Sequence, residues 1–128
     1  FPGYKSTLLS MAKLRTVINE SHPSWHSALS SVGGVYLLTD NTTGMMYVGS
    51  AYGDEGIWSR WSNYANNGHG RNVELKQLRS KQGDAHAEQF QVSILEICDI
   101  DSAKEAVIAR ENYWKTVLRT REFGLNSN

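Results

Sequence analysis

Apolar side chains recur at helical spacing near the start of the chain, over residues 6–19. They return every three or four positions, and Ser6 is placed to cap the first turn of a helix. A shorter apolar stretch follows Pro23 and stops before a pair of glycines, Gly33 and Gly34. The pattern therefore predicts a helix over residues 6–19 and a brief second helix after Pro23.

The periodicity changes after Gly34, where two short runs are rich in β-branched and aromatic residues. These runs cover residues 35–39 and 45–48, and the turn-forming stretch 40–44 between them ends in Gly44. Such an arrangement is typical of two antiparallel strands joined by a tight hairpin. A turn centred between Asn41 and Thr42 would place Tyr36 opposite Tyr47, within one residue of slippage.

Helical spacing resumes after a loop over residues 50–56, and four further elements are predicted. They are a helix over 57–67, a basic helix capped by Asn72, a strand over 89–97 and a long helix from Ser102 to about Arg121. Ser102 and Glu105 have the spacing of a capping box, which marks the start of the last helix. The elements together predict an α+β fold (α/β in the broad sense), with a small antiparallel sheet flanked by helices.

Composition narrows the class of protein. The chain has 128 residues, which fits one domain with one continuous core. Its single cysteine, Cys98, lies in an apolar run and is expected to pack in the core, so neither a disulfide framework nor a cysteine-based metal site is expected. No apolar stretch approaches the roughly 20 residues of a membrane-spanning helix, and no signal-peptide pattern is present. We therefore expect an intracellular, cytoplasmic protein. Because the chain opens with Phe1 rather than methionine, we also expect it to be part of a longer protein.

Charge is balanced overall but unevenly distributed. Thirteen basic residues offset thirteen acidic ones, so the net charge gives no argument for a nucleic-acid partner. Between positions 60 and 81, however, five basic residues face one acid, whereas between 84 and 105 acids predominate. A one-sided basic surface of this kind can dock a phosphate backbone, although ordinary solvated faces explain it equally well.

Two tyrosines stand out within the predicted hairpin. Tyr36 and Tyr47 are expected on the same face of the sheet, because directly opposed residues share a face. One interpretation is an aromatic cross-strand pair that fills the core. The other is a site, since Gly34 and Gly49 beside the strands leave the backbone open to a ligand.

The last predicted helix carries a carboxylate, Glu111, among the apolar positions of its inner stripe. A buried carboxylate is expected to be paired, protonated or bound to a metal ion. An ion pair with Arg60 or Arg110 is one hypothesis. The other is a magnesium ion, which often uses one or two carboxylates and keeps its waters. Zinc is less favoured, because the four histidines lack ligand spacing apart from His22 and His26, which lie four residues apart.

A further pair, Arg60 and Tyr64, lies one helical turn apart and so shares a face of its helix. An arginine in this position can grip a phosphate with two hydrogen bonds, although a surface arginine is the commoner reading.

These residues in their order resemble the GIY-YIG nuclease superfamily. The resemblance rests on Gly-Val-Tyr ending at Tyr36, Tyr-Val-Gly starting eleven residues later at Tyr47, and four later positions. Those positions are Arg60, Tyr64, Glu111 and Asn126. The resemblance implies a three-stranded antiparallel sheet flanked by helices over residues 33–128, with residues 1–32 as an added N-terminal helical extension.

By this resemblance, Glu111 binds a divalent cation, Mg²⁺ or Mn²⁺, and Arg60 holds the scissile phosphate. Tyr36, Tyr47 and Tyr64 line the site, with Tyr36 favoured as the base that activates water, and Asn126 supports the site by hydrogen bonding. A phenol with an ordinary pKa near 10 is a poor base at neutral pH, so either the metal or Arg60 favours the phenolate of Tyr36, or Tyr36 only positions the water. We expect substrate contacts from Gly49, Ser50, His69 and Arg71.

The sequence departs from the family pattern in two ways that affect the mechanism. Ser50 stands where some members carry lysine or histidine, so a proton relay through that position cannot be carried over. Tyr64 stands where many members carry histidine. The implied function is an endonuclease on DNA, with an upstream part of the protein choosing the target. The alternatives are a nuclease-derived module that binds nucleic acid or protein without cutting, and a purely structural domain.

Overall fold

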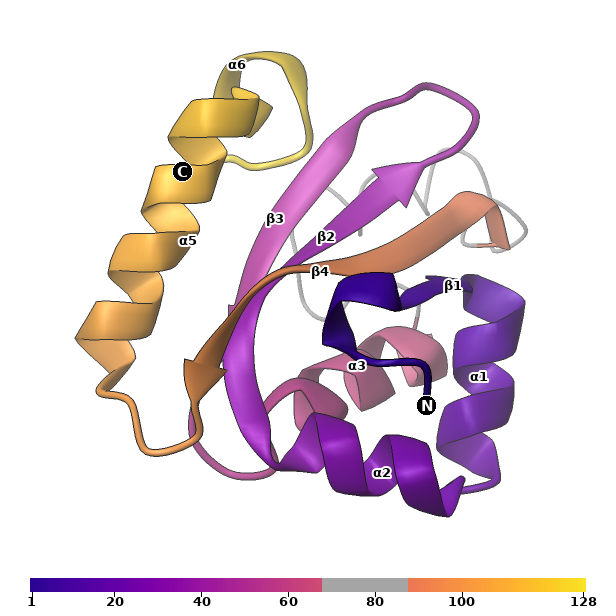
Figure 1. Ribbon diagram of the computed structural model, residues 1–128. Helices are drawn as coiled ribbons and strands as arrows, with labels where there is room; N and C mark the ends of the chain where they lie inside the picture. Colours follow the sequence, from indigo (N-terminus) through magenta and orange to yellow (C-terminus); the bar gives the residue numbers. More distant parts are fainter. Residues whose placement is uncertain (68–87) are drawn as a thin grey trace.

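The computed structural model describes residues 1–67 and 88–128 of the chain (Figure 1). Its elements are η1 (Tyr4–Ser6), β1 (Leu8–Ser10), α1 (Met11–Asn19), α2 (Pro23–Ser30), β2 (Val32–Asp40), β3 (Met46–Ala51), α3 (Gly56–Asn67), β4 (Phe90–Asp99), α5 (Lys104–Leu118) and α6 (Thr120–Phe123). The basic helix predicted after Asn72 lies outside the described residues. Of the helices that are described, none has the length and apolar character needed to cross a membrane.

One antiparallel sheet organises the molecule, with the strand order β1-β4-β2-β3. The predicted antiparallel sheet flanked by helices is confirmed, and its three predicted strands are β2, β3 and β4. The fourth strand, β1, was predicted as the start of a helix, and it pairs with β4 at the opposite edge from β3. The helix begins later because Ser10, rather than Ser6, is its cap: the Ser10 hydroxyl accepts a hydrogen bond from the Lys13 amide.

Helices cover both faces of the sheet, as Figure 1 shows: α1, α2 and α3 lie on one side and α5 on the other. The larger core lies under α1–α3 and receives Tyr36 and Leu38 from β2. Val35, which points the other way, is also fully buried but lies outside that core cluster. Alternation along β2 therefore sends Tyr36 towards α3, as the sequence predicts.

The hairpin between β2 and β3 differs in register from its prediction. Tyr36 lies opposite Gly49, and Tyr47 lies opposite Leu38, so the pairing has moved by two residues. Residues 41–45 connect the two strands, and Asp40 organises this loop by accepting hydrogen bonds from the Thr42 amide and hydroxyl. Because strand side chains alternate with a period of two, the shift keeps both tyrosines on the same face.

The last helix begins and ends inside its predicted bounds. Its N-cap is Ala103, with no side-chain cap hydrogen bond, so the capping box predicted for Ser102 and Glu105 does not form. At the other end, Arg119 adopts a left-handed conformation with φ of 55°, which terminates α5 before the short helix α6 begins.

Candidate active site

A pocket of about 340 Å³ lies beside the edge strand β3, between α3 and α5. Six of its lining residues were singled out from the sequence: Tyr36, Tyr47, Ser50, Arg60, Tyr64 and Glu111. Five others complete the wall: Tyr52, Ile108, Asn112, Lys115 and Asn128. The fold thus brings residues from two strands and two helices around one cavity, although Tyr36 and Glu111 lie 75 positions apart in the sequence.

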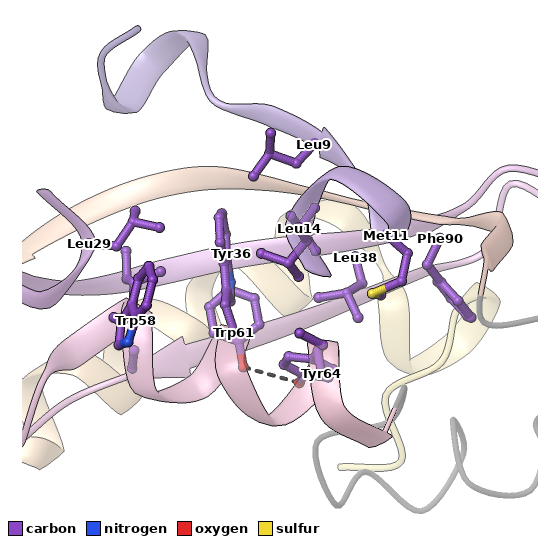
Figure 2. Packing of buried hydrophobic residues seen from close by; sticks show 14 of the residues in the cluster. Leu9, Met11, Leu14, Leu29, Tyr36, Leu38, Trp58, Trp61, Tyr64 and Phe90 are labelled. Carbon is purple, nitrogen blue, oxygen red and sulfur yellow. Dashed lines mark hydrogen bonds between the residues drawn. The ribbon is translucent and has the colours of Figure 1, made fainter. Parts of the chain in front are cut away.

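Tyr36 and Tyr64 form the inner wall of the pocket. Their hydroxyl oxygens lie 3.1 Å apart, and their rings meet edge to face with centroids separated by 5.8 Å (Figure 2). Trp61 also packs edge to face with Tyr36, and their ring centroids lie 6.1 Å apart. Both tyrosines are only 2% exposed. Aromatic packing of this kind holds the two phenols in a fixed orientation.

Burial changes the acid–base behaviour of these phenols. It raises the pKa of Tyr36 well above the usual value, with a smaller contribution from the neighbouring Tyr47. Burial likewise raises the pKa of Tyr64, and the adjacent tyrosines add to this effect. Both phenols are therefore protonated at neutral pH and act as hydrogen-bond donors. Burial thus opposes the phenolate that the predicted base role of Tyr36 requires, whereas the nearby Arg60 acts in the opposite direction on its pKa.

Gly34 and Gly49 lie inside β2 and β3, where they allow close packing rather than leaving the backbone open. A Cβ on Gly49 would lie 2.6 Å from the ring and hydroxyl of Tyr36, so the tyrosine already fills that space. A Cβ on Gly34 would lie 2.2 Å from the Glu96 carbonyl oxygen in β4. The expectation that Gly49 contacts substrate rested on open backbone, and the Tyr36 ring covers it.

Arg60 reaches the pocket from α3 with its guanidinium over the ring of Tyr52, 5.2 Å from the centroid. Lys104 places its ammonium 5.5 Å from the centroid of the same ring. Within the described part of the chain, no carboxylate forms an ion pair with Arg60. Its charge is thus held by an aromatic surface and remains free to bind an anion such as a phosphate.

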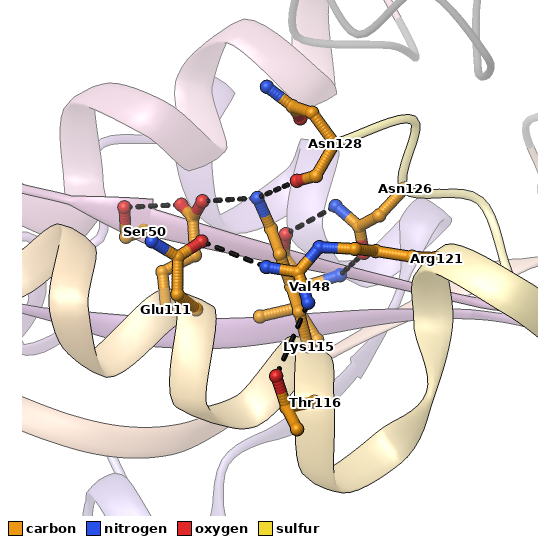
Figure 3. A network of polar contacts seen from close by, with 9 residues as sticks. Val48, Ser50, Glu111, Lys115, Thr116, Arg121, Asn126 and Asn128 are labelled. Carbon is orange, nitrogen blue, oxygen red and sulfur yellow. Dashed lines mark hydrogen bonds and ion pairs between the residues drawn. The ribbon is translucent and has the colours of Figure 1, made fainter.

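Glu111 projects from α5 into the opposite wall of the pocket. One carboxylate oxygen accepts a hydrogen bond from the Ser50 hydroxyl at 2.5 Å, and the other lies 2.7 Å from the ammonium of Lys115 (Figure 3). Its partner is therefore Lys115 rather than Arg60 or Arg110. Arg110 instead pairs with Glu96, and its hydrogen bonds lower the pKa of that carboxyl.

Lys115 is a pocket residue that the sequence analysis did not single out. It is 4% exposed, and its ammonium also donates to the Asn128 carbonyl oxygen at 2.9 Å. The signal for its pairing was present, because Glu111 and Lys115 have the i, i+4 spacing and order that favour an ion pair on a helix. The burial of Lys115 could not be predicted from the sequence, since a lysine at this spacing on a helix is usually a surface residue.

Asn126 supports the site from outside the pocket. Its side-chain oxygen accepts from the Val48 amide at 2.8 Å, and its side-chain nitrogen donates to the Val48 carbonyl at 3.0 Å (Figure 3). Both bonds are buried. The amide thereby pairs with the outer edge of β3 as another strand would, and fixes the backbone between Tyr47 and Gly49.

The donor set fits a hard divalent cation that is bound by few protein ligands. Glu111 offers the pocket a partly buried carboxylate with side-chain exposure of 18%, and the Ser50 hydroxyl lies beside it. In residues 1–67 and 88–128, no three His, Cys, Asp or Glu side chains gather as a metal site. His26 pairs with Glu55 instead of joining His22. One carboxylate with water and phosphate oxygens suits magnesium better than zinc.

Two residues expected to contact substrate, His69 and Arg71, lie outside the described residues. The expected Ser50 contact is placed at the pocket wall, where its hydroxyl is engaged with Glu111.

Comparison with known families gives one match that spans most of the chain. The model of the GIY-YIG catalytic domain matches residues 32–126. That range includes every residue of the pocket except Asn128.

Individual relatives agree with this match. The chain is 31% identical over 93 residues to intron-associated endonuclease 1 of Enterobacteria phage T4, an alignment that covers 73% of this chain and 36% of the phage protein. Two solved structures are similar, both of the catalytic domain of the homing endonuclease I-TevI. A point mutant gives a TM-score of 0.58 at 26% identity, covering 76% of this chain and 94% of that one. The second gives 0.53 at 31% identity, covering 73% and 96%.

Proposed function

Because the chain belongs to the GIY-YIG catalytic domain family, we propose that it is an endonuclease domain that hydrolyses phosphodiester bonds of DNA with a divalent cation, Mg²⁺ or Mn²⁺. One observation carries the proposal: a single pocket joins Arg60, which has no carboxylate partner among the described residues, with the Glu111 carboxylate and four phenols. Attack on a phosphodiester concentrates negative charge on the phosphoryl oxygens, so a cationic group near a positioned water is the chemistry required.

Arg60 binds the scissile phosphate in this proposal and stabilises the charge that develops on it, while Tyr52 holds its guanidinium in place. Glu111 is the protein ligand of the cation. When bound, that cation supplies positive charge to the phosphate and lowers the pKa of a water. Because the carboxylate is partly buried, its oxygens have lost competing water.

Three of the four phenols, those of Tyr36, Tyr47 and Tyr64, differ in what they can do. Tyr36 and Tyr64 stay protonated and orient the attacking water or a phosphate oxygen by donating hydrogen bonds. Tyr47 is the least buried of the three, so it is the most accessible to a water in the pocket, and we assign it the contact with the attacking water. Asn126 keeps Tyr47 at the right place in the strand.

DNA as the substrate, and a separate segment that selects the target, are further parts of the proposal. The phage relative is an intron-associated endonuclease, and this chain covers only 36% of its length. The excess of basic residues between positions 60 and 81 supplies charge for a phosphate backbone. The chain's own pocket supplies hydrolysis, and recognition of a target is assigned to other parts of the protein.

The experiment is cleavage of supercoiled plasmid by the 128-residue chain with Mg²⁺ or Mn²⁺, beside an EDTA control. Glu111→Gln, which keeps the shape and removes the charge, is expected to lower cleavage by at least about a hundredfold. Glu105→Gln, at an exposed position of the same helix, is the matched control and should cut like the wild type. Equal cutting by Glu111→Gln, or cutting that persists in EDTA, would contradict the proposal.

A second candidate function is a nuclease-derived module that binds nucleic acid without cutting. The observation that favours it is the pairing of Glu111 with Lys115, which places an ammonium at the carboxylate that a cation would use. Retention of the plasmid in a gel without cleavage, abolished by Arg60→Ala, would support this candidate over the nuclease.

A further inference from the structure

Lys115 is a buried cation on the wall of the candidate active site. Its side chain is 6% exposed, and two groups hold its ammonium: Glu111 at 2.7 Å and the Asn128 carbonyl at 2.9 Å. A buried ammonium is expensive to desolvate, and two close oxygen partners at a pocket wall compensate for that loss. The position carries a charge where a helix facing a sheet normally places an apolar side chain.

The arrangement around Glu111 uses both carboxylate oxygens. Ser50 donates to one and Lys115 to the other, as Figure 3 shows. A divalent cation at this carboxylate therefore has to share it with the ammonium, and the two positive charges repel each other within a few ångströms.

The charges that line the pocket also disfavour the binding of a cation on its own. Among its described lining residues, Arg60 and Lys115 are cationic and Glu111 is the one carboxylate. The side chains that line the pocket therefore carry one net positive charge before any ligand enters, which favours an anion over a free metal ion. A phosphate group brings negative charge into the pocket, and this charge favours the binding of a cation there.

We propose that Lys115 is a positioning residue that holds the Glu111 carboxylate and makes divalent-cation binding depend on the DNA phosphate, so that metal and substrate enter the site together. This inference rests on the proposed function of the pocket. Without DNA, Lys115 stands in for the cation and keeps Glu111 oriented. With DNA, the phosphate offsets the ammonium, and the cation binds beside it.

The test is Mn²⁺ binding to the 128-residue chain, measured by titration of the electron paramagnetic resonance signal of free Mn²⁺. Lys115→Met, which keeps the length of the side chain and removes its charge, is expected to bind Mn²⁺ at least about tenfold more tightly than the wild type. Lys115→Arg retains the charge and should restore wild-type affinity. Glu111→Gln combined with Lys115→Met should lose the gain, because the ligand is gone.

A second titration contains a short duplex with phosphorothioate linkages, which slow hydrolysis. The duplex should tighten Mn²⁺ binding by the wild type by about the same tenfold, and should tighten binding by Lys115→Met by much less. If Lys115 had only a structural role, its replacement by methionine would neither tighten Mn²⁺ binding without the duplex nor reduce the effect of the duplex on Mn²⁺ binding. Circular dichroism checks the fold, and Lys115→Gln replaces Lys115→Met if the latter is unfolded.

Unchanged or weaker Mn²⁺ binding by the neutral Lys115 variants would overturn the inference. Plasmid cleavage by the wild type separates this failure from that of the proposed function. If the wild type cuts and the neutral variants bind Mn²⁺ no better, only the role of Lys115 is wrong. If the wild type does not cut and no variant binds Mn²⁺, both the role and the proposed function are wrong.

Discussion

Tyr36 and Gly49 act as one unit at the scale of single residues. They lie opposite each other in the β2–β3 hairpin, and the tyrosine ring occupies the space where a Cβ of residue 49 would be. Gly49, in the Tyr-Val-Gly motif, therefore fixes the direction of Tyr36, in the Gly-Val-Tyr motif. This gives a physical reason for the pairing of a tyrosine with a glycine across two strands, because any larger residue would turn the phenol out of the pocket.

The aromatic surface beneath Arg60 leads to a prediction about activity. Tyr52→Leu removes the ring over which the guanidinium lies and should lower kcat/KM for DNA cleavage by about three- to tenfold. Tyr52→Phe keeps the ring and should stay within about twofold of the wild type. Steady-state cleavage of a labelled duplex measures both, and an equal loss in the two variants would assign the effect to the hydroxyl instead.

Sequence reasoning identified single residues well where their chemistry is unusual for their setting. Tyr36, Tyr47, Arg60 and Glu111 were singled out, and all line one pocket. Lys115 was missed because a lysine four residues after a glutamate is ordinary on a helix surface, and one sequence does not show which turn of a helix is buried. The distance from Glu111 to Lys115 is a property of the folded chain, as is the raised pKa of Tyr36.

At the scale of elements, β3 depends on a segment that follows α6. The Leu125 amide donates to the Met46 carbonyl, and Asn126 pairs twice with Val48, so two residues near the end cover the open edge of the sheet. An uncovered edge would leave backbone donors and acceptors without partners and free to pair with other chains.

Asn126→Ala should therefore lower the free energy of unfolding by about 2–4 kcal/mol, because it leaves the buried amide and carbonyl of Val48 without partners. Asn126→Asp keeps the acceptor and loses the donor, so its loss should be smaller at neutral pH. Urea unfolding followed by tryptophan fluorescence measures both. A loss below about 0.5 kcal/mol for Asn126→Ala would show that water replaces the amide.

The type of each described element could be read from the sequence more reliably than its bounds or register. The predicted hairpin register was wrong by two residues because the Asp40 side chain organises the loop over residues 41–45, and hydrophobic alternation does not encode that loop. The strand β1 was missed because Leu8 and Leu9 suit a helix as well as a strand, and only the partner strand β4 decides between them. Patterns in a short stretch of sequence predict local structure, whereas strand pairing depends on residues that are distant in the sequence.

At the scale of the whole molecule, the N-terminal residues pack into the main core. Leu14 is fully buried with Leu9 and Met11 in the cluster that also holds Tyr36 and Tyr64. Leu14→Ala should lower the free energy of unfolding by about 2–5 kcal/mol. Leu8→Ala, at a neighbouring leucine that is 58% exposed, should change it by less than about 0.5 kcal/mol.

Denaturant unfolding of the two leucine variants checks this prediction. Equal small losses in both variants would mean that residues 1–32 form an extension whose stability is separate from that of the rest. Such an extension is what the sequence predicts for residues 1–32. A large loss in Leu14→Ala alone would show that these residues fold with the nuclease-like part as one unit.

Stability at alkaline pH follows from the buried phenols. In the folded chain, the pKa values of Tyr36 and Tyr64 are raised, whereas in the unfolded chain both lie near 10. Above about pH 10, the unfolded state releases protons that the folded state retains, so stability present below that pH is lost as the pH rises. Each such phenol contributes a slope of about 1.4 kcal/mol per pH unit.

Unfolding free energies measured between pH 8 and pH 11 should therefore fall steeply above pH 10 in the wild type. The fall should be shallower in Tyr64→Phe, which has one fewer phenol to ionise. Tyr113→Phe, at a residue that is 50% exposed, is the control and should follow the wild type. Parallel curves for the wild type and Tyr64→Phe would show that Tyr64 ionises in the folded chain as it does in the unfolded one.

Because Leu125 and Asn126 cover the edge of β3, the site can be completed only late in the synthesis of the chain. A ribosome delivers β2, β3 and α3 long before it delivers residues 125 and 126, which hold the backbone beside Tyr47. Until those two residues leave the exit tunnel, the strand that carries Tyr47 and Ser50 has an open edge. The emerging chain is thus expected to be inert towards nucleic acid nearby, and to gain its cutting geometry only when nearly all of the fold has been made.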